Sequence, residues 1–220
     1  SNARAYDTTW EIRRGVAGCV NDESVIIHST MSVAAAALQK VLDIEAQWKV
    51  ENTGEISVTM QVKKNMEFPQ LPRFGLRLFL KGEYEGLKFY GLGPHESYVD
   101  KHRSCSHGLY ETTVAEQHED YLRPQENGSH TDCDYLILKG TDLTFAAAGE
   151  KTFSFNVSPY TQEELTAKKH SYELQPCGST VVCLDYAQNG IGSNSCGPEL
   201  SEQYRLDAEE FDFEIKMIIK

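Results

Sequence analysis

The 220-residue sequence has no apolar run of the roughly 18 residues that a membrane-spanning helix needs. Its most apolar stretch, SVAAAALQKVL, is too short and is interrupted by polar residues. Basic clusters are missing too, since 21 Lys and Arg stand against 33 Asp and Glu, a net charge of −12. Because nucleic-acid binding depends on clustered Lys and Arg that displace counterions, we expect no nucleic-acid partner and no membrane span.

Motifs for nucleophilic catalysis and for metal binding are also absent. There is no GxSxG segment, no CxxC pair among the six cysteines and no HExxH spacing among the seven histidines. Two glycine-rich stretches, GLGP and GIGSNSCGP, lack the strand–loop–helix context of a phosphate-binding loop. We therefore predict no metal site and no cofactor in this chain, and cysteines that are mostly buried free thiols.

Period-two alternation is the strongest pattern that is present. Residues 42–50, 56–62, 152–158 and 211–219 alternate apolar and polar side chains. Successive side chains of a strand point to opposite faces, so these segments are predicted to be antiparallel strands with one wet face. Further strands are expected at residues 8–13, 24–29, 74–80, 87–93, 134–140, 143–149 and 179–186, with turns that include Gly149-Glu150.

Helical signals are weak. Thr161 precedes Glu164 by the spacing of a capping box, which predicts about two helical turns within residues 161–170. Residues 113–121 could form one short turn. Many short strands with few helices favour a large antiparallel sandwich. Residues 1–3, SNA, look like the remnant of a cleaved expression tag, and residues 4–220 are expected to form a single domain.

Two polar loops bounded by Gly and Pro hold carboxylates, Glu96 and Glu126, that do not belong to the polar faces of strands. The stretch YLRPQENGSHTD, residues 121–132, is interpreted as a rigid polar loop in which Arg123 and Glu126 fix the geometry. The stretch GPHESYVD places Glu96 beside His95 in a similar setting. Neither loop shows a complete catalytic set.

Several long stretches, in order and in register, resemble one family. FYGLGPHESYVDK, YLRPQENGSHTD, FNVSPYTQEELTAKKHSYEL and NGIGSNSCGPEL are similar to segments of the C-terminal domain of large bacterial β-galactosidases of glycoside hydrolase family two. The resemblance extends from about Trp10 to Lys220. It implies an all-β fold, an antiparallel supersandwich similar to galactose mutarotases.

The resemblance also implies a function. In this family the catalytic glutamates lie in a separate TIM barrel of about 200 or more residues, for which the chain has no room. The chain is therefore expected to be the non-catalytic small-chain region of an enzyme that hydrolyses terminal β-D-galactosides. Its partners would be the remaining domains and a galactoside, any Mg²⁺ or Na⁺ would bind in those other domains, and an oligomer is compatible. The bacterial cytoplasm and the periplasm both stay open as locations.

Specific residue roles follow from the same resemblance. In some members, the loop that matches GIGSNSCGP carries a tryptophan that stacks on the sugar, whereas this chain has a shorter loop without it. The residues expected at the sugar are Asn194, Ser195, Cys196 and Gly197. The residues expected to hold the polar loops are His95, Glu96, Tyr98, Asp100, Arg123, Glu126, Asn127 and Asp132.

Two other interpretations remain open. The chain could be a free-standing carbohydrate-binding module. It could also be an enzyme similar to aldose 1-epimerases, which needs an acid and a base that converge on one sheet face. The residues available for that chemistry are His95, His107, His170 and Glu126.

Overall fold

The computed structural model describes residues 8–21, 23–35, 40–81, 84–193 and 197–220. The chain divides into two compact units. The first contains residues up to Leu71 together with Arg205–Ile219, and the second contains Pro72–Tyr204 with Lys220. All named strand pairs are antiparallel, which confirms the predicted all-β, antiparallel class.

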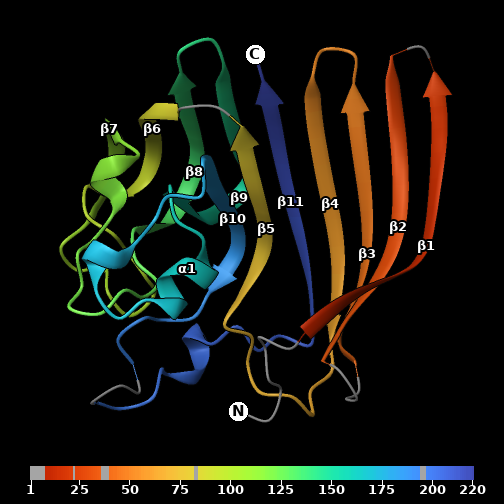
Figure 1. Cartoon of the computed structure of the whole chain (residues 1–220). Coiled ribbons are helices and arrows are strands. Elements are labelled where there is room, and N and C mark those ends of the chain that lie inside the picture. Colours follow the sequence, from red (N-terminus) through yellow and green to blue (C-terminus); the bar gives the residue numbers. More distant parts are fainter. Residues whose placement is uncertain (1–7, 22, 36–39, 82–83, 194–196) are drawn as a thin grey trace. The chain divides into compact units, whose positions relative to one another are not determined.

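The first unit is a five-stranded sheet. Its strands lie side by side in the order β1-β2-β3-β4-β11 (Figure 1). Their bounds are Thr8–Asn21 for β1, Ser24–Ala35 for β2, Lys40–Glu51 for β3, Glu55–Lys64 for β4 and Glu210–Ile219 for β11.

Alternation fixes which face of this sheet is buried. Ile44, Val58 and Ile215 are at most 1% exposed, and Val58 lies opposite Ile215 in the β4–β11 register. Glu45 and Gln47, the neighbours of buried Ile44 and Ala46 along β3, are exposed. The predicted strands at residues 42–50, 56–62 and 211–219 are therefore confirmed, including their wet face.

The second unit contains six strands in the order β7-β6-β8-β9-β10-β5. Their bounds are Arg73–Lys81 for β5, Tyr84–Gly93 for β6, Ser106–Thr113 for β7, Ser129–Gly140 for β8, Thr144–Ser158 for β9 and Ser179–Gln188 for β10. The strand β7 was not predicted. The predicted strands at 143–149 and 152–158 are one continuous strand, β9.

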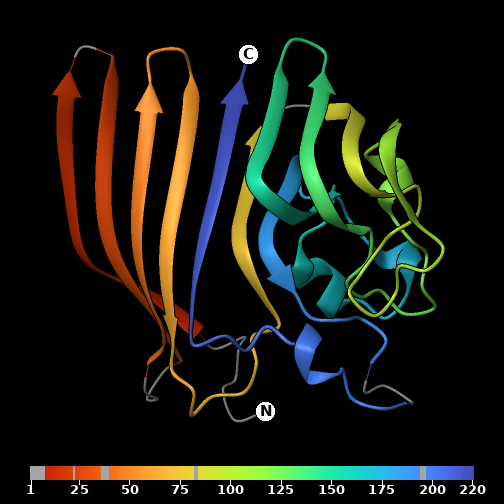
Figure 2. The ribbon, with the colours of Figure 1, turned by 180° about the vertical axis from the view of Figure 1, so that it is seen from behind.

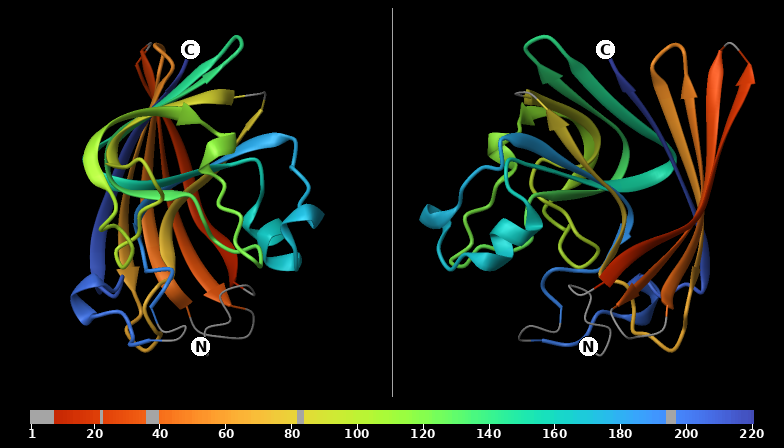
Figure 3. Two further views of the ribbon diagram at one scale, coloured as in Figure 1. Left: turned by 90° about the vertical axis from the view of Figure 1, so that its left-hand side faces the viewer. Right: turned by 45° about the vertical axis from the view of Figure 1, so that its right-hand side comes forward.

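The turn predicted at Gly149-Glu150 is wrong, because β9 bends there without reversing. Tyr135 of β8 pairs with Ala148, whereas Cys133 pairs with Phe153, so β9 has extra residues between these pairs. A Cβ at Gly149 would lie 2.3 Å from the Lys151 carbonyl oxygen, which shows how tight the bend is. Figures 2 and 3 show the resulting curve of β9 (teal). The glycine marks a bulge.

The wet face predicted for residues 152–158 is also wrong. Ser154 and Asn156 are 6% and 4% exposed. The Asn156 amide donates a 2.5 Å hydrogen bond to the Asn127 carbonyl, which belongs to the polar loop 121–128. That loop covers Asn156, so this polar side chain of β9 is buried and hydrogen-bonded.

Helical elements are short and belong to the second unit. The α-helix α1, Gln162–Ala167, begins as predicted, because the Thr161 hydroxyl accepts a 3.0 Å hydrogen bond from the Glu164 amide. It is shorter than predicted, ending before Lys168. The described residues also contain the 3₁₀ turns η2 Ala115–Gln117, η3 Ser171–Glu173 and η4 Glu202–Tyr204. Within the described ranges, no helix is long and apolar enough to cross a membrane.

Candidate functional site

Glu96 joins the polar loop GPHESYVD, residues 93–100, to the polar loop 121–132. Its side chain is nearly buried, at 5% exposed for the residue. One carboxylate oxygen accepts a 2.7 Å hydrogen bond from the Gly128 amide, and the other accepts from the Tyr121 hydroxyl and from the Lys101 ammonium. Hydrogen bonds to a charged acceptor are among the strong ones, so this carboxylate fixes both ends of the loop 121–128.

Tyr98, two residues after Glu96, lies in the core of the second unit. It is fully buried, and its hydroxyl accepts a 3.3 Å hydrogen bond from the Ser129 amide. Burial, together with the neighbouring carboxylates Glu126 and Glu96, raises the pKa of the Tyr98 hydroxyl well above its ordinary value. The side chain therefore stays neutral and serves as a hydrogen-bonding anchor for the start of β8.

Asp100 joins the polar loop 93–100 to the glycine-rich loop that follows β10. Its carboxylate accepts hydrogen bonds from the successive amides of Ile191, Gly192 and Ser193 at 3.0, 3.0 and 2.8 Å, and from the Ser193 hydroxyl at 2.7 Å. A Cβ at Gly190 would lie 2.0 Å from this carboxylate, so only glycine fits there. Partial burial raises the pKa of Asp100, but these hydrogen bonds outweigh burial and lower it overall.

Glu126 is held by an arginine that sequence reasoning did not single out. Arg73 donates to Glu126 at 3.0 Å and to Asp185 of β10 at 2.5 Å, and the Ser129 hydroxyl donates to Glu126 at 2.9 Å. Arg123 is exposed, and within the described residues it pairs with no carboxylate. The signal for Asp185 was present in the sequence, because it is the one charged residue in the apolar run STVVCLDY.

The guanidinium of Arg73 lies between two carboxylates. The pKa of Asp185 is raised to about 6, because burial raises it by more than Arg73 lowers it. For Arg73, burial lowers the pKa, but Asp185 and Glu126 outweigh burial and raise it above the ordinary value. The retaining glycosidase mechanism needs two carboxyls about 5 Å apart with the sugar between them. Here the Arg73 guanidinium lies between Glu126 and Asp185 and binds both, so these three residues form a structural triad.

The remaining polar-loop residues have separate environments. Asn127 is 6% exposed, and its side chain accepts from the Glu119 amide and donates to the Gln125 carbonyl. His95 is exposed, and its carbonyl oxygen contacts the Cys105 thiol. Asp132 is exposed and has a φ of 56°, at a register shift between β8 and β9.

The residues expected at the sugar are only partly described. Asn194, Ser195 and Cys196 lie outside the described residues. Gly197 is exposed, and a Cβ placed on it would meet open space. The base of this loop, at residues 191–193, is fixed by Asp100.

Histidines do not assemble an epimerase-type acid and base in the described part of the chain. His107 lies 3.0 Å from the Asp132 carbonyl, and His170 lies 3.3 Å from Glu173. His130, which sequence reasoning placed only in a loop, is buried against Phe89 and Phe155, and burial lowers its pKa to about 4.

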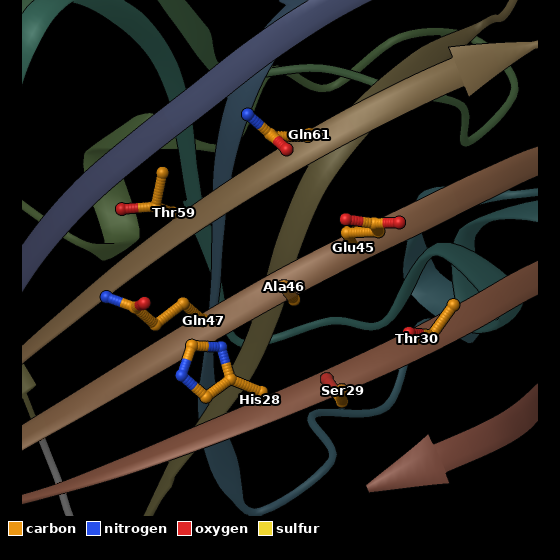
Figure 4. Close-up of a pocket in the computed structure, with 8 residues that line it drawn as sticks. All are labelled: His28, Ser29, Thr30, Glu45, Ala46, Gln47, Thr59 and Gln61. Atoms are coloured by element: carbon orange, nitrogen blue, oxygen red, sulfur yellow. The ribbon is translucent and has the colours of Figure 1, made fainter. Parts of the chain in front are cut away.

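A polar groove of about 350 Å³ lies on the wet face of the first unit (Figure 4). His28, Gln47 and Thr59 are cross-strand neighbours on β2, β3 and β4, and Glu45 and Gln61 form the next such row. Among the described residues, no aromatic ring except the His28 imidazole lines the groove, and no second carboxylate faces Glu45 across it. It is the solvated face of an amphipathic sheet.

Cysteines and metal ligands add no further site. Cys105, Cys133, Cys177 and Cys183 are free, and of these Cys133 and Cys183 are buried. Burial raises the pKa of the Cys183 thiol to about 12, so this thiol is not a reactive nucleophile. Among the described residues, no group of three or more His, Cys, Asp and Glu could hold a metal ion.

The fold and the loops define an all-β, antiparallel protein whose polar motifs tie its loops together. A family model described as beta galactosidase small chain matches residues 3–217, and the chain belongs to this family. It is 42% identical over 98% of its length to a beta-galactosidase of Actinobacillus pleuropneumoniae, and 38% identical over 90% to one of Staphylococcus xylosus. It spans 20% of each of these relatives.

A third relative, a beta-galactosidase of Kluyveromyces lactis, is 36% identical over 76% of the chain, which covers 16% of that relative. A solved protein of Escherichia coli K12, named as a candidate aldose 1-epimerase, covers 94% of this chain and 68% of its own length at 8% identity. Its TM-score is 0.40, and this likeness supports no argument about the fold.

Proposed function

We propose that the chain is the non-catalytic small-chain region of a β-galactosidase that hydrolyses terminal β-D-galactosides. The observation that carries this proposal is the match itself: almost the whole chain aligns with one fifth of each of two beta-galactosidases. The carboxylates support the same proposal. The buried ones that the structure describes both have hydrogen-bonding partners: Glu96 accepts from the polar loop 121–128, and Asp185 accepts from Arg73 of β5. Hydrolysis would then depend on carboxylates elsewhere in the parent enzyme, as would any Mg²⁺ or Na⁺.

Two exposed side chains on neighbouring loops support packing against the rest of such an enzyme. Leu122 is fully exposed and Tyr172 is 84% exposed. Their loops touch, because the Ser171 hydroxyl donates a 3.4 Å hydrogen bond to the Tyr121 carbonyl. Large apolar side chains that share an exposed surface mark interaction sites more often than isolated ones do. We propose this surface as part of the contact with the remaining domains.

The loop after β10 is the proposed contribution to the sugar site. Asp100 fixes residues 191–193, so the loop base is rigid, and Asn194, Ser195, Cys196 and Gly197 follow directly. A rigid scaffold that presents variable loop residues is the usual arrangement for binding functions. In this proposal these four residues complete the galactoside site of the parent enzyme from outside its barrel.

The test uses the parent enzyme with and without this region. The 220-residue chain alone should not hydrolyse a nitrophenyl β-galactoside. A parent enzyme that lacks the region should lose activity, and the separately purified chain should restore it. Leu122→Ser should weaken this restoration, whereas Leu143→Ser, at a 45% exposed position in the β8–β9 hairpin, should not. Turnover by the isolated chain, or full activity without it, would overturn the proposal.

A further inference from the structure

The strand β7 is an end strand of the sheet in the second unit, because among the described residues it pairs with β6 alone (Figure 1). An end strand presents a row of unpaired backbone amides and carbonyls, which can pair with a strand of another chain. Natural sheets often protect such an edge with Lys, Pro or a bulge. The sequence of β7, SHGLYETT, has no Lys and no Pro, and its register with β6 has no shift.

The opposite end of the same sheet is different. There β5 pairs with β10 alone in the described residues, and it carries three cations, Arg73, Arg77 and Lys81, and no carboxylate. Pairing of β5 with a second β5 would place like charges close together, which is destabilising. The edge at β5 is thus protected against a second copy of the chain, whereas the edge at β7 is not.

The direction of the backbone groups of β7 follows from two hydrogen bonds at its end. The Val114 amide donates to a carbonyl of β6 at 2.9 Å, whereas the Thr113 amide turns away from β6 and donates to the Glu116 carboxylate at 3.1 Å. Successive residues of an antiparallel strand direct their amides and carbonyls to opposite edges. The residues of β7 that share the direction of Thr113, and so direct both groups away from β6, are His107, Leu109 and Glu111.

The side chains of these three residues share one exposed face and are self-complementary. Leu109 is 52% exposed and lies opposite Tyr90 of β6, which is 39% exposed. If two copies of β7 run antiparallel with Leu109 at the two-fold axis, Leu109 meets Leu109, and His107 meets Glu111 twice. A shift by two residues in either direction would place Leu109 against Glu111 or His107 instead. Cross-strand pairs that are apolar or of opposite charge stabilise a sheet, so one register is preferred.

The polar groups on this face are positioned for that register. The Glu111 carboxylate accepts from the Lys88 ammonium at 2.5 Å, and its side chain is still 69% exposed. His107 Nε2 lies 3.0 Å from the Asp132 carbonyl oxygen and 3.3 Å from the Asp134 carboxylate. Both of these groups accept, so Nε2 carries a proton and Nδ1 is left for another partner. The protonated ring donates from Nδ1 as well, and this cation complements Glu111 of a second copy.

We propose that β7 pairs antiparallel with β7 of a second copy of this chain, around a two-fold axis at Leu109. The six-stranded sheet of each copy would then continue into that of the other. A two-fold contact of this kind uses the same surface on both copies and closes as a dimer. One short strand is a small contact beside the roughly 1,200–2,000 Å² of stable interfaces, so we expect a reversible dimer. This inference goes beyond the proposed function, because it needs neither a galactoside nor a parent enzyme.

Sedimentation velocity of the 220-residue chain over a series of concentrations measures the monomer–dimer equilibrium, and circular dichroism checks the fold of each variant. We expect the wild type to dimerise reversibly. Leu109→Ser should raise the dissociation constant by about tenfold, because both copies lose the contact at the axis. Leu143→Ser is the matched control, since it makes the same change at a 45% exposed leucine in the β8–β9 hairpin and should leave the constant unchanged.

Two charge variants test the register itself. His107→Glu and Glu111→Lys each remove the opposite charges across the axis, so each variant alone should dimerise about tenfold more weakly than the wild type. A mixture of the two variants should associate again. In the mixed dimer the two carboxylates of one strand meet the lysine and the histidine of the other, an effect that non-specific association would not show.

The inference is overturned if the wild type stays monomeric, if Leu143→Ser weakens the dimer as much as Leu109→Ser does, or if the mixed charge variants stay apart. A dimer that is weakened by Leu122→Ser and not by Leu109→Ser would also overturn it, because the exposed loop surface would then be the contact. Restoration of a truncated parent enzyme is a separate measurement, so either proposal can fail without the other.

Discussion

Removing the Arg73 guanidinium tests how much the loops of the second unit depend on its buried charges. In the Arg73→Met variant, Asp185 keeps its place on β10, with its side chain 3% exposed, and loses its cation. Breaking one partner of a buried ion pair costs about 3–5 kcal/mol, because the remaining charge is left uncompensated. In a chain of this size each kcal/mol shifts the midpoint of thermal unfolding by about 2–4 °C, so a fall of roughly 6–20 °C is expected.

Thermal and urea unfolding, followed by circular dichroism, would measure this change. The pH dependence separates the electrostatic effect from lost packing. In the wild type the pKa of Asp185 is already raised to about 6, above its unfolded value. Losing Arg73 removes the cation that lowers this pKa, so the pKa rises further in the variant and protonation favours the variant's fold more strongly. The deficit of Arg73→Met relative to the wild type should therefore shrink as the pH falls from 7 towards 5.

A double variant supplies the control. Arg73→Met combined with Asp185→Leu removes both charges and should recover most of the lost stability, because apolar replacement of a buried pair is often neutral. Glu126→Gln should cost less than Arg73→Met, since the Glu126 side chain is 26% exposed. If Arg73→Met unfolds within 1 kcal/mol of the wild type, or if its deficit does not depend on pH, the triad does not hold the loop.

Three further changes address single contacts. Gly128→Ala should lower the urea midpoint more than Gly178→Ala does: both glycines have positive φ, but only at Gly128 would the Cβ meet the Gln117 carbonyl, at 2.1 Å; equal losses would show that the contact is unimportant. Thr161→Ala should cost about 1 kcal/mol through loss of the helix N-cap, and no change in urea unfolding would contradict the cap. The pKa of Asp100 is lowered in the folded chain, so its ionised carboxylate contributes stability that is present above about pH 4 and is lost as the pH falls further. The Asp100→Asn variant should therefore lose less stability than the wild type as the pH falls below about 4. Parallel losses of stability in the two proteins would refute this.

The sequence predicted the first unit well, because there each strand meets one wet and one dry environment. Ile44 is buried and Glu45 exposed, which is the alternation that the letters show. The same reasoning failed at Ser154 and Asn156, which are both buried, and the environment of Asn156 depends on a loop about thirty residues away. Period-two alternation states which side chains share a face, but it does not state what covers that face.

The polar loops show the same limit. Glu96 and Asp100 stood out in the sequence as carboxylates in a Gly/Pro-bounded loop, yet their partners include the backbone amides of residues 128 and 191–193. Backbone amides have no letter of their own in a sequence. Arg73 and Asp185 are 112 positions apart, and only the pairing of β5 with β10 brings them together. The motifs and their order were recognised from contiguous stretches of sequence, whereas these pairings join residues that only the folded chain brings together.

The Asp100 carboxylate has a consequence for how the neighbouring loop could change over evolutionary time. The base of that loop is positioned by an acid ninety residues earlier in the chain, through main-chain amides and one hydroxyl. Those contacts come from residues 191–193. A replacement at positions 194–197 therefore removes none of the groups that bind Asp100, so these positions can change while the loop base keeps its hydrogen bonds. A loop with the sequence Ser-Cys-Gly and a loop with a bulkier aromatic residue could have the same hydrogen bonds to an Asp at its base. Relatives would then differ in the side chains that they present to a ligand while the loop base stays the same.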